Sequence, residues 1–343
     1  MARTSLLDRP LPPAVRRIAG SRLAHALTVP HGPSRFLESI SPAWTLDERH
    51  AVVTRVHRET AHAITLTLRP GRWDGHRAGQ HVVVGVEVEG VMQRRPYTIT
   101  SSEHRRDGQL TITVARHPEG RLSRALHDRA RPGLVVELSA PTGDVVLPTE
   151  RPHELLLVSG GSGVTPTLSM VRTLLDEHHT GPVHVLHYAT TPEDTIAAAG
   201  LQALARNHRG LHVTVVHTRQ PVAGAALTGH LTAAHLDAVL GAEAAATPRT
   251  THVCGPLALV DAVTDLFGRG VLAGDLLVET FVPRPRPTPT AGEDTWGELT
   301  CATSGTTIAN DGRTILEQAE AAGLAPVAGC RMGICHTCVL PKR

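Results

Sequence analysis

The pattern of apolar residues changes near residue 150, and no other feature of the sequence constrains the fold as strongly. From about residue 50 to 148, β-branched residues recur with period 2 in short runs that Gly and Asp-Gly turns separate. Short strands spaced in this way predict a closed antiparallel barrel. From about residue 153 onward, strands and helices alternate, which predicts a parallel, doubly wound sheet. We expect barrel strands at 51–56, 63–68, 81–88, 109–116 and 134–138, and sheet strands at 153–159, 183–188, 211–217, 251–254 and 276–279.

A glycine-rich turn follows the first strand of the predicted parallel sheet. Gly160, Gly161 and Gly163 would let the backbone approach a pyrophosphate closely, and Thr165-Pro166 opens the next helix. Open sheets of this kind bind ligands at the carboxyl ends of their strands. The spacing differs from the usual G-x-G-x-x-G, so a tight strand-to-helix connection without a ligand stays an alternative.

The barrel pattern contains the run Arg95-Pro96-Tyr97-Thr98. An Arg can hold phosphate oxygens in a fork of N–H donors, and a Tyr two residues later can lay its ring against a flat heterocycle. Residues i and i+2 of a strand share a face, so Arg95 and Tyr97 project together. An ordinary half-buried strand with an Arg at its rim is the alternative interpretation.

A short helix is expected from Gly120 to about Ala130, entered through Gly120-Arg121-Leu122-Ser123. The N-terminus of a helix presents unpaired N–H groups to an anion. A pyrophosphate could therefore lie between this helix and Arg95, whereas a simple cap by Ser123 is the alternative.

Composition limits the classes of function. A chain of 343 residues suits two or three domains, and a net charge of +2 argues against an electrostatic nucleic-acid binder. No apolar run approaches the roughly 18–20 residues of a transmembrane helix, and the N-terminus lacks the features of a secretory signal. We therefore expect a cytoplasmic protein without a transmembrane segment.

Residues 294–343 form a separate unit that carries a cysteine motif. A Pro-rich, semi-rigid linker at 282–293 precedes it, and we expect a strand at 298–303 and a helix at 314–322 within it. Cys330, Cys335 and Cys338 follow the pattern C-x4-C-x2-C, which is the spacing of a plant-type [2Fe–2S] loop. A zinc site formed with His336 is the less favoured alternative, because adjacent Cys335 and His336 can hardly face one metal.

The order of these motifs resembles the ferredoxin–NADP reductase superfamily over about residues 48–281. The motifs are R-P-Y-T, G-R-L-S, G-G-S-G-V-T-P, Cys254-Gly255-Pro256 and Glu279-Thr280-Phe281. The last unit resembles plant-type ferredoxin. Segments 14–19 and 34–40 predict short helices, so we expect an N-terminal helical extension at 1–47. The resemblance implies an antiparallel β-barrel flavin domain (48–150), an α/β doubly wound nucleotide domain (151–281) and a partial α+β (β-grasp) ferredoxin domain (294–343).

The resemblance also implies roles for individual residues. Arg95 would contact the flavin phosphates, with Pro96 beside it, Tyr97 on the isoalloxazine ring and Thr98 near its reactive nitrogen. Gly120 and Ser123 would hold the pyrophosphate of FAD. The nicotinamide dinucleotide would be bound by Gly160, Gly161, Gly163, Thr165 and Pro166, with Cys254 and Gly255 beside the nicotinamide and Phe281 near the flavin.

The transfer of electrons from NAD(P)H to a flavin depends on positioning and requires no side-chain acid or base, so no catalytic side chain is predicted. A buried structural thiol is the alternative for Cys254. Arg219, after the third strand of the sheet, could reach a 2′-phosphate, which favours NADPH over NADH.

The fourth ligand of a plant-type cluster would lie some tens of residues after Cys338, and the sequence ends at Arg343. We therefore expect a truncated ferredoxin unit, because Cys254 and Cys301 are not natural substitutes.

Reductases that combine a flavin domain with a cluster domain serve oxygenases and desaturases. The cysteine loop and Pro42-Ala43-Trp44 resemble the actinobacterial electron-transfer partners of stearoyl-CoA desaturase. The resemblance implies an oxygenase or a membrane-bound fatty-acyl desaturase as the acceptor, with attachment to the membrane only through that partner. A flavin reductase for a soluble acceptor, with no functional cluster, is the alternative function, and a scaffold without flavin is a third.

Overall fold

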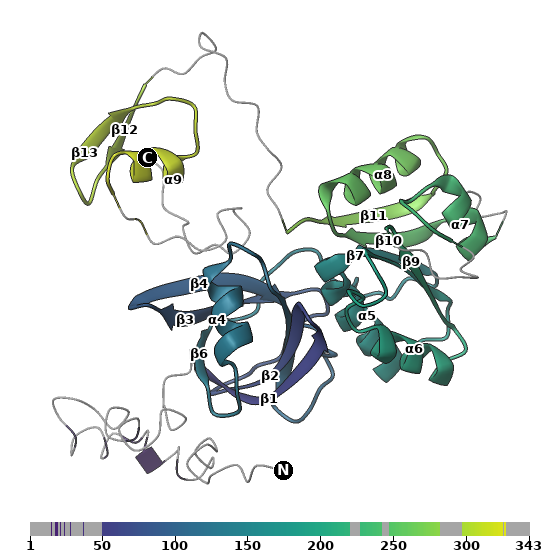
Figure 1. Cartoon of the computed structure of the whole chain (residues 1–343), viewed down its shortest axis with the longest axis horizontal. Helices are drawn as coiled ribbons and strands as arrows, with labels where there is room; N and C mark the ends of the chain where they lie inside the picture. Colours follow the sequence, from purple (N-terminus) through teal and green to yellow (C-terminus); the bar gives the residue numbers. More distant parts are fainter. Residues whose placement is uncertain are drawn as a thin grey trace. The chain divides into compact units, whose positions relative to one another are not determined.

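The computed structural model describes residues 50–219, 227–241, 247–281 and 297–324, together with a few single residues before residue 50 and Pro326. The chain divides into two compact bodies, Met1–Phe281 and Val282–Arg343 (Figure 1). Most of the predicted N-terminal helical extension, the linker and the loop with Cys330, Cys335 and Cys338 lie outside the described residues.

The first part of the larger body is the antiparallel barrel that the period-2 pattern predicts. Its strands are β1 (His50–Thr60), β2 (Ala63–Pro70), β3 (His81–Val88), β4 (Val91–Thr98), β5 (Leu110–Ala115) and β6 (Val135–Leu138), in the order β4-β3-β6-β1-β2-β5. A bridge between Ile99 and Ile112 joins the two outer strands and closes the barrel. The helix α4 (Arg121–Arg129) buries Leu122 and Leu126 in the barrel core, so its N-terminus has a fixed place beside the strands.

The second part is a parallel sheet with helices on both faces. Its elements are β7 (Leu155–Gly160), the 3-10 turn η3 (Gly161–Gly163), α5 (Val164–Asp176), β8 (Val183–Ala189), α6 (Ala198–Asn207), β9 (Leu211–His217), α7 (Ala233–Leu240), β10 (Arg249–Cys254), α8 (Leu257–Gly268) and β11 (Gly274–Glu279). The strand order is β11-β10-β7-β8-β9, with every neighbouring pair parallel. Leu157 faces the core under α5 and Val158 faces the core under α7 and α8, which explains the continuous apolar run of β7.

The helix α5 joins the parallel sheet to the barrel. Val164 and Leu168 pack with Ala63 of β2, and the Ser169 hydroxyl donates a 3.0 Å hydrogen bond to the carbonyl of Ser101. The Arg172 guanidinium donates to the carbonyl of Thr100. These contacts hold the turn η3, which begins α5, next to the barrel.

The smaller body contains the hairpin β12 (Glu298–Cys301) and β13 (Thr306–Ala309) and the helix α9 (Ile315–Ala321). Thr314 caps α9: its hydroxyl accepts from the Glu317 N–H at 3.2 Å, and the Glu317 carboxylate accepts from the Thr314 N–H. The predicted strand and helix are therefore present, whereas β13 was not predicted. No helix among the described residues is both long and apolar enough to cross a lipid bilayer.

Candidate functional site

Two adjacent arginines on β4 have different surroundings. The Arg94 guanidinium donates two hydrogen bonds, of 2.8 and 3.0 Å, to the Glu137 carboxylate on β6. The exposed Arg95 donates to the carbonyl of Arg94 and pairs with no carboxylate among the described residues. Arg95 is therefore the arginine of this pair that can take an external anion.

Tyr97 and Thr98 end the same strand. The Tyr97 ring is half-buried against the barrel core, and burial raises the pKa of its hydroxyl. Thr98 is buried, with 4% of its surface exposed. Pro96 lies on an outer strand of the sheet order, where the missing N–H costs no ladder hydrogen bond in the interior. Arg95 and Tyr97 are two residues apart in regular strand, so they share a face as the sequence predicts.

The N-terminus of α4 has no side-chain cap. The Ser123 hydroxyl donates to the Gly120 carbonyl and accepts from the His117 N–H, both at 3.1 Å. A Cβ on Gly120 would lie 2.5 Å from the Ser123 oxygen, so glycine lets the Ser123 side chain pack against this turn. The first turn contains no acidic residue, and its N–H groups have no intrahelical partner. The donors that this site can offer an anion are therefore these N–H groups rather than the Ser123 hydroxyl.

The glycines of the turn after β7 serve different purposes. A Cβ on Gly163 would lie 2.1 Å from the Cys254 carbonyl oxygen, and one on Gly160 would lie 2.9 Å from Pro256. Gly161 has φ +54° and open space where a Cβ would lie. Gly160 and Gly163 are thus needed to pack two strand ends together, whereas Gly161 leaves the turn open on its outer side. The first turn of α5 follows with Pro166, and the Thr165 hydroxyl donates to the Ser162 carbonyl at 3.0 Å.

Cys254 and Glu279 end neighbouring strands and lie opposite each other in the register. The thiol and the carboxyl are close enough for each to influence the pKa of the other. Burial, and then the neighbouring Glu279, raise the pKa of Cys254, while burial raises the pKa of Glu279 to about 8. The place of Glu279 beside Cys254 cannot be predicted from the sequence, because only the strand order brings the two residues together. Phe281 lies two residues beyond, half-buried.

Arg219 lies at the same edge of the sheet. Its N–H donates to the Thr190 carbonyl at 3.1 Å, and its side chain is exposed. The residues after β7, β9, β10 and β11 therefore meet at one carboxyl edge, as the doubly wound pattern predicts.

Three families match successive parts of the chain. Residues 54–147 match the oxidoreductase FAD-binding domain, residues 157–265 the oxidoreductase NAD-binding domain, and residues 299–341 the 2Fe-2S iron-sulfur cluster binding domain. An NADPH oxidoreductase of Mycobacterium tuberculosis is 33% identical over 325 residues, which cover 93% of this chain and 82% of the relative. The chain belongs to the ferredoxin reductase-type oxidoreductases with a C-terminal [2Fe–2S] domain. This reductase passes electrons from NAD(P)H through FAD to a [2Fe–2S] cluster.

Two further relatives of the reductase are informative. The glycine betaine monooxygenase reductase subunit of Pseudomonas aeruginosa is 28% identical over 288 residues, which cover 78% of this chain and 76% of the relative. The solved structure of phthalate dioxygenase reductase superimposes with a TM-score of 0.60 at 24% identity and covers 84% of both chains. That structure supports the fold of the reductase.

The residues of the barrel edge suit FAD. Arg95, which has no carboxylate partner within the described part of the chain, and the uncapped N-terminus of α4 both suit a diphosphate. They belong to elements in contact, β4 and α4. The individual roles of Arg95, Tyr97, Thr98, Gly120 and Ser123 stay predictions. The three cluster cysteines lie outside the described residues.

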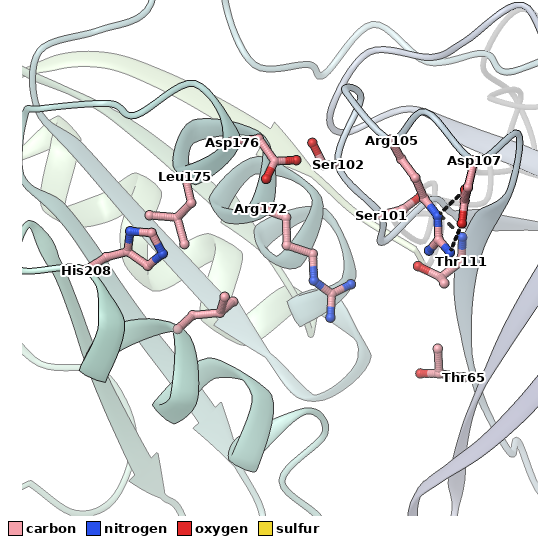
Figure 2. Close-up of a pocket in the computed structure, with 11 residues that line it drawn as sticks. Thr65, Ser101, Ser102, Arg105, Asp107, Thr111, Arg172, Leu175, Asp176 and His208 are labelled. Atoms are coloured by element: carbon pink, nitrogen blue, oxygen red, sulfur yellow. Dashed lines mark hydrogen bonds and ion pairs between the residues drawn. The ribbon is translucent and has the colours of Figure 1, made fainter.

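An open cleft of about 530 Å³ lies at the other end of α5 in the reductase. Figure 2 shows Arg172 reaching from α5 into the space opposite Arg105 and Asp107, which are joined to each other. The Ser101 hydroxyl accepts from the Thr111 N–H. No predicted site residue lines this cleft. Arg105, Ser101 and Arg172 already form hydrogen bonds within the protein, so the nucleotide is not assigned to this cleft.

Glu103, His104 and Glu177 near this cleft have ligand atoms within 4.8 Å of one another. Arg151, however, lies 2.5 Å from Glu103 and 2.6 Å from Glu177. Because one guanidinium already pairs with both carboxylates, this cluster of the reductase is an ion-pair network rather than a metal site.

Proposed function

We propose that the reductase holds FAD at the β4 and α4 edge of the barrel and NAD(P)H at the carboxyl edge of the sheet. The domains would be a flavin domain at 48–150, a nucleotide domain at 151–281, a linker at 282–293 and a ferredoxin unit at 294–343. The observation that carries the proposal is the contrast between Arg94, which is paired with Glu137, and Arg95, which no carboxylate among the described residues neutralises.

The side chains at these two edges bind and orient. Arg95 and the first turn of α4 would bind the diphosphate of FAD, and Tyr97 would pack on its ring. Gly161 leaves room for the dinucleotide. The raised pKa values of Cys254 and Glu279 keep these two side chains uncharged at the same edge. Bound FAD supplies the chemistry that links a two-electron donor to one-electron acceptors.

The coenzyme is proposed to be NADPH. Arg219 is exposed at the carboxyl edge, where a guanidinium can bind a 2′-phosphate. The M. tuberculosis relative is an NADPH oxidoreductase. Steady-state assays that compare NADPH with NADH test this choice, and an equal or higher kcat/KM with NADH rejects it.

The acceptor is proposed to be an oxygenase, with a membrane-bound fatty-acyl desaturase as the more specific candidate. The P. aeruginosa relative is a reductase subunit of a monooxygenase, which supports an oxygenase partner. The reductase would then work in the cytoplasm and reach a membrane only through its partner.

The flavin site is tested by Arg95→Ala with Arg94→Ala as the matched control. Loss of a charge-assisted hydrogen bond costs about 2 kcal/mol, so Arg95→Ala should weaken FAD binding roughly 30-fold. Arg94→Ala removes the pair with Glu137 and should leave FAD affinity within about threefold of wild type. Fluorescence titration of the apoprotein with FAD measures both, and equal losses would reject the assignment of Arg95.

The electron path is tested with Cys335→Ser in the full chain. This variant should keep NAD(P)H-dependent dye reduction and lose transfer to a one-electron protein acceptor. Cys301→Ser, which changes a cysteine of β12 outside the C-x4-C-x2-C motif, should keep both activities. Retention of both activities in Cys335→Ser would favour a flavin reductase without a functional cluster. A purified protein that retains no FAD would favour the scaffold.

A further inference from the structure

The edge that carries Cys254 also contains buried polar atoms without partners. Both ring nitrogens of His252 and the Oε2 atom of Glu279 are buried and make no hydrogen bond to any described residue. A buried polar atom without a partner typically costs about 1–3 kcal/mol, so a group of three requires an explanation.

The strand register brings these atoms to one face of the sheet. Cys254 lies opposite Glu279, and His252 lies two residues before Cys254 on β10, so all three side chains share a face. The His252 Nε2 atom is 3.9 Å from the Glu279 Oε2 atom. His252 is only 1% exposed and the Glu279 side chain 12% exposed.

The distance of 3.9 Å lies between the separation of a direct hydrogen bond and that of two groups bridged by a water. A bridging water would need its two partners roughly 4.5 Å apart, because each hydrogen bond is about 2.8 Å long. A direct N···O hydrogen bond is about 2.7–3.2 Å long, so a small side-chain rotation is sufficient to form it. A direct hydrogen bond would satisfy Oε2 and one imidazole nitrogen together, with no further group between them.

We propose that His252 is a positioning residue that accepts a hydrogen bond from the protonated carboxyl of Glu279 and thereby keeps Glu279 uncharged beside Cys254. The proposal deepens the proposed function, because it rests on the placement of NAD(P)H at this edge. His252 touches neither coenzyme nor flavin and acts through Glu279.

The surroundings favour this proton distribution over an ion pair. Burial lowers the pKa of His252 to about 4 and raises the pKa of Glu279 to about 8, so both groups are neutral near pH 7. Burial is the only cause for His252, and the Cys254 thiol is the only other group that acts on Glu279. On the same face of the sheet, but two strands away from β10, His187 of β8 hydrogen-bonds through Nδ1 to the Ser159 hydroxyl at 2.9 Å.

An uncharged Glu279 has a consequence for coenzyme exchange. The nicotinamide ring is neutral in NAD(P)H and cationic in NAD(P)+. A carboxylate at this edge would hold the oxidised coenzyme more tightly than the reduced one, whereas a neutral carboxyl does not discriminate by charge. His252 would thus favour release of the oxidised coenzyme after each transfer.

The test is an infrared pH titration of the carbonyl band of the protonated carboxyl in the purified flavoprotein. The absence of this band in E279Q assigns it to Glu279. In H252F, which keeps a planar ring without an acceptor, the midpoint of Glu279 should fall by about one pH unit, a tenfold change in its protonation equilibrium. H252Q, whose amide oxygen can accept the hydrogen bond, should restore most of that shift.

Two results with the variants would overturn the proposal: a midpoint in H252F equal to or above that of wild type, or the same shift in H252Q as in H252F. A third is a wild-type band that is already lost by about pH 5 as the pH rises, because an ordinary carboxyl titrates there. If H252F does not fold, H252L replaces it in the same titration. FAD content and dye reduction are measured on each variant. If the wild-type protein bound no FAD and reduced no dye, the proposed function would be refuted. A negative infrared result alone would refute only the role of His252.

Discussion

The ionisable groups at the two ends of α5 have opposite surroundings. At its N-terminal end, the carboxyl edge of the sheet contains His252, Cys254 and Glu279, which are largely buried and pair with no Lys or Arg among the described residues. At its C-terminal end, Glu103 and Glu177 meet Arg151 at 2.5 and 2.6 Å. Burial raises the pKa of Glu279 to about 8, whereas the hydrogen bond from Arg151 is the largest of the causes that lower the pKa of Glu177 to about 2.

This difference distinguishes a ligand-binding site, at the N-terminal end of α5, from a contact between domains, at its C-terminal end. A contact between domains is stabilised when carboxylates pair with a cation. Arg151 makes such a contact, because it bonds Glu103 of a barrel loop, the Pro148 carbonyl after the barrel and Glu177 at the end of α5. A site that must receive a ligand keeps groups that the chain itself does not satisfy. The comparison therefore predicts that changes at the two ends of α5 will affect different properties.

The largest effect is expected at the N-terminal end, from Gly163→Ala. The added Cβ would lie 2.1 Å from the Cys254 carbonyl oxygen, so the two strand ends must separate. We expect a loss of about 3 kcal/mol in the free energy of unfolding, together with weaker NAD(P)H binding. Urea unfolding and coenzyme titration measure the two effects.

Gly161→Ala is the matched control for that prediction. A Cβ there meets open space, and only the left-handed φ of +54° opposes it, at a cost of about 1 kcal/mol. Equal destabilisation by the two variants would show that close packing of the strand ends is not what requires Gly163.

A smaller effect is expected at the C-terminal end, from Arg151→Ala. The change leaves two partly buried carboxylates close together without their cation. We expect a loss of about 2 kcal/mol in the free energy of unfolding, with coenzyme affinity unchanged. Arg269→Ala breaks an exposed pair with Asp265 and should change stability by less than about 0.5 kcal/mol. A change of coenzyme affinity in Arg151→Ala would contradict the separation of the two ends.

The sequence predicts the architecture well because periodicity is a local property. The period-2 runs became the barrel strands, and the apolar run before Gly160 became the central strand β7. The strand β13 was missed, since Thr306 and Thr307 begin it and its pattern of half-buried and exposed residues leaves little apolar alternation to detect.

The sequence does not predict which residues the strand order brings together. Cys254 and Glu279 are 25 positions apart and become neighbours only through the parallel pairing of β10 with β11. The requirement for Gly163 also arises from a contact between the turn η3 and the end of β10, not from a ligand motif. Arg94 and Arg95 are chemically identical in the sequence, and only the position of Glu137 on β6 distinguishes them.

The smallest expected effect, from Glu177→Gln, is a change in the pH dependence of stability. The folded pKa of Glu177 is lowered to about 2, first by the Arg151 hydrogen bond. Its contribution is therefore complete above the unfolded pKa of roughly 4.3 and is lost as the pH falls toward 2. Because the side chain is 23% exposed, we discount that contribution to about 1 kcal/mol.

Urea unfolding of wild type and Glu177→Gln between pH 2 and 7 measures this contribution. The difference between the two proteins should be constant above about pH 5 and should shrink toward zero near pH 2. Glu279→Gln should differ from wild type in the opposite direction. The folded pKa of Glu279 is raised to about 8, so the wild-type carboxyl stabilises the fold at low pH and loses that contribution as the pH rises from roughly 4.3 toward 8. If the difference in stability from wild type changed with pH in the same direction for both variants, the opposite pKa shifts of Glu177 and Glu279 would be contradicted.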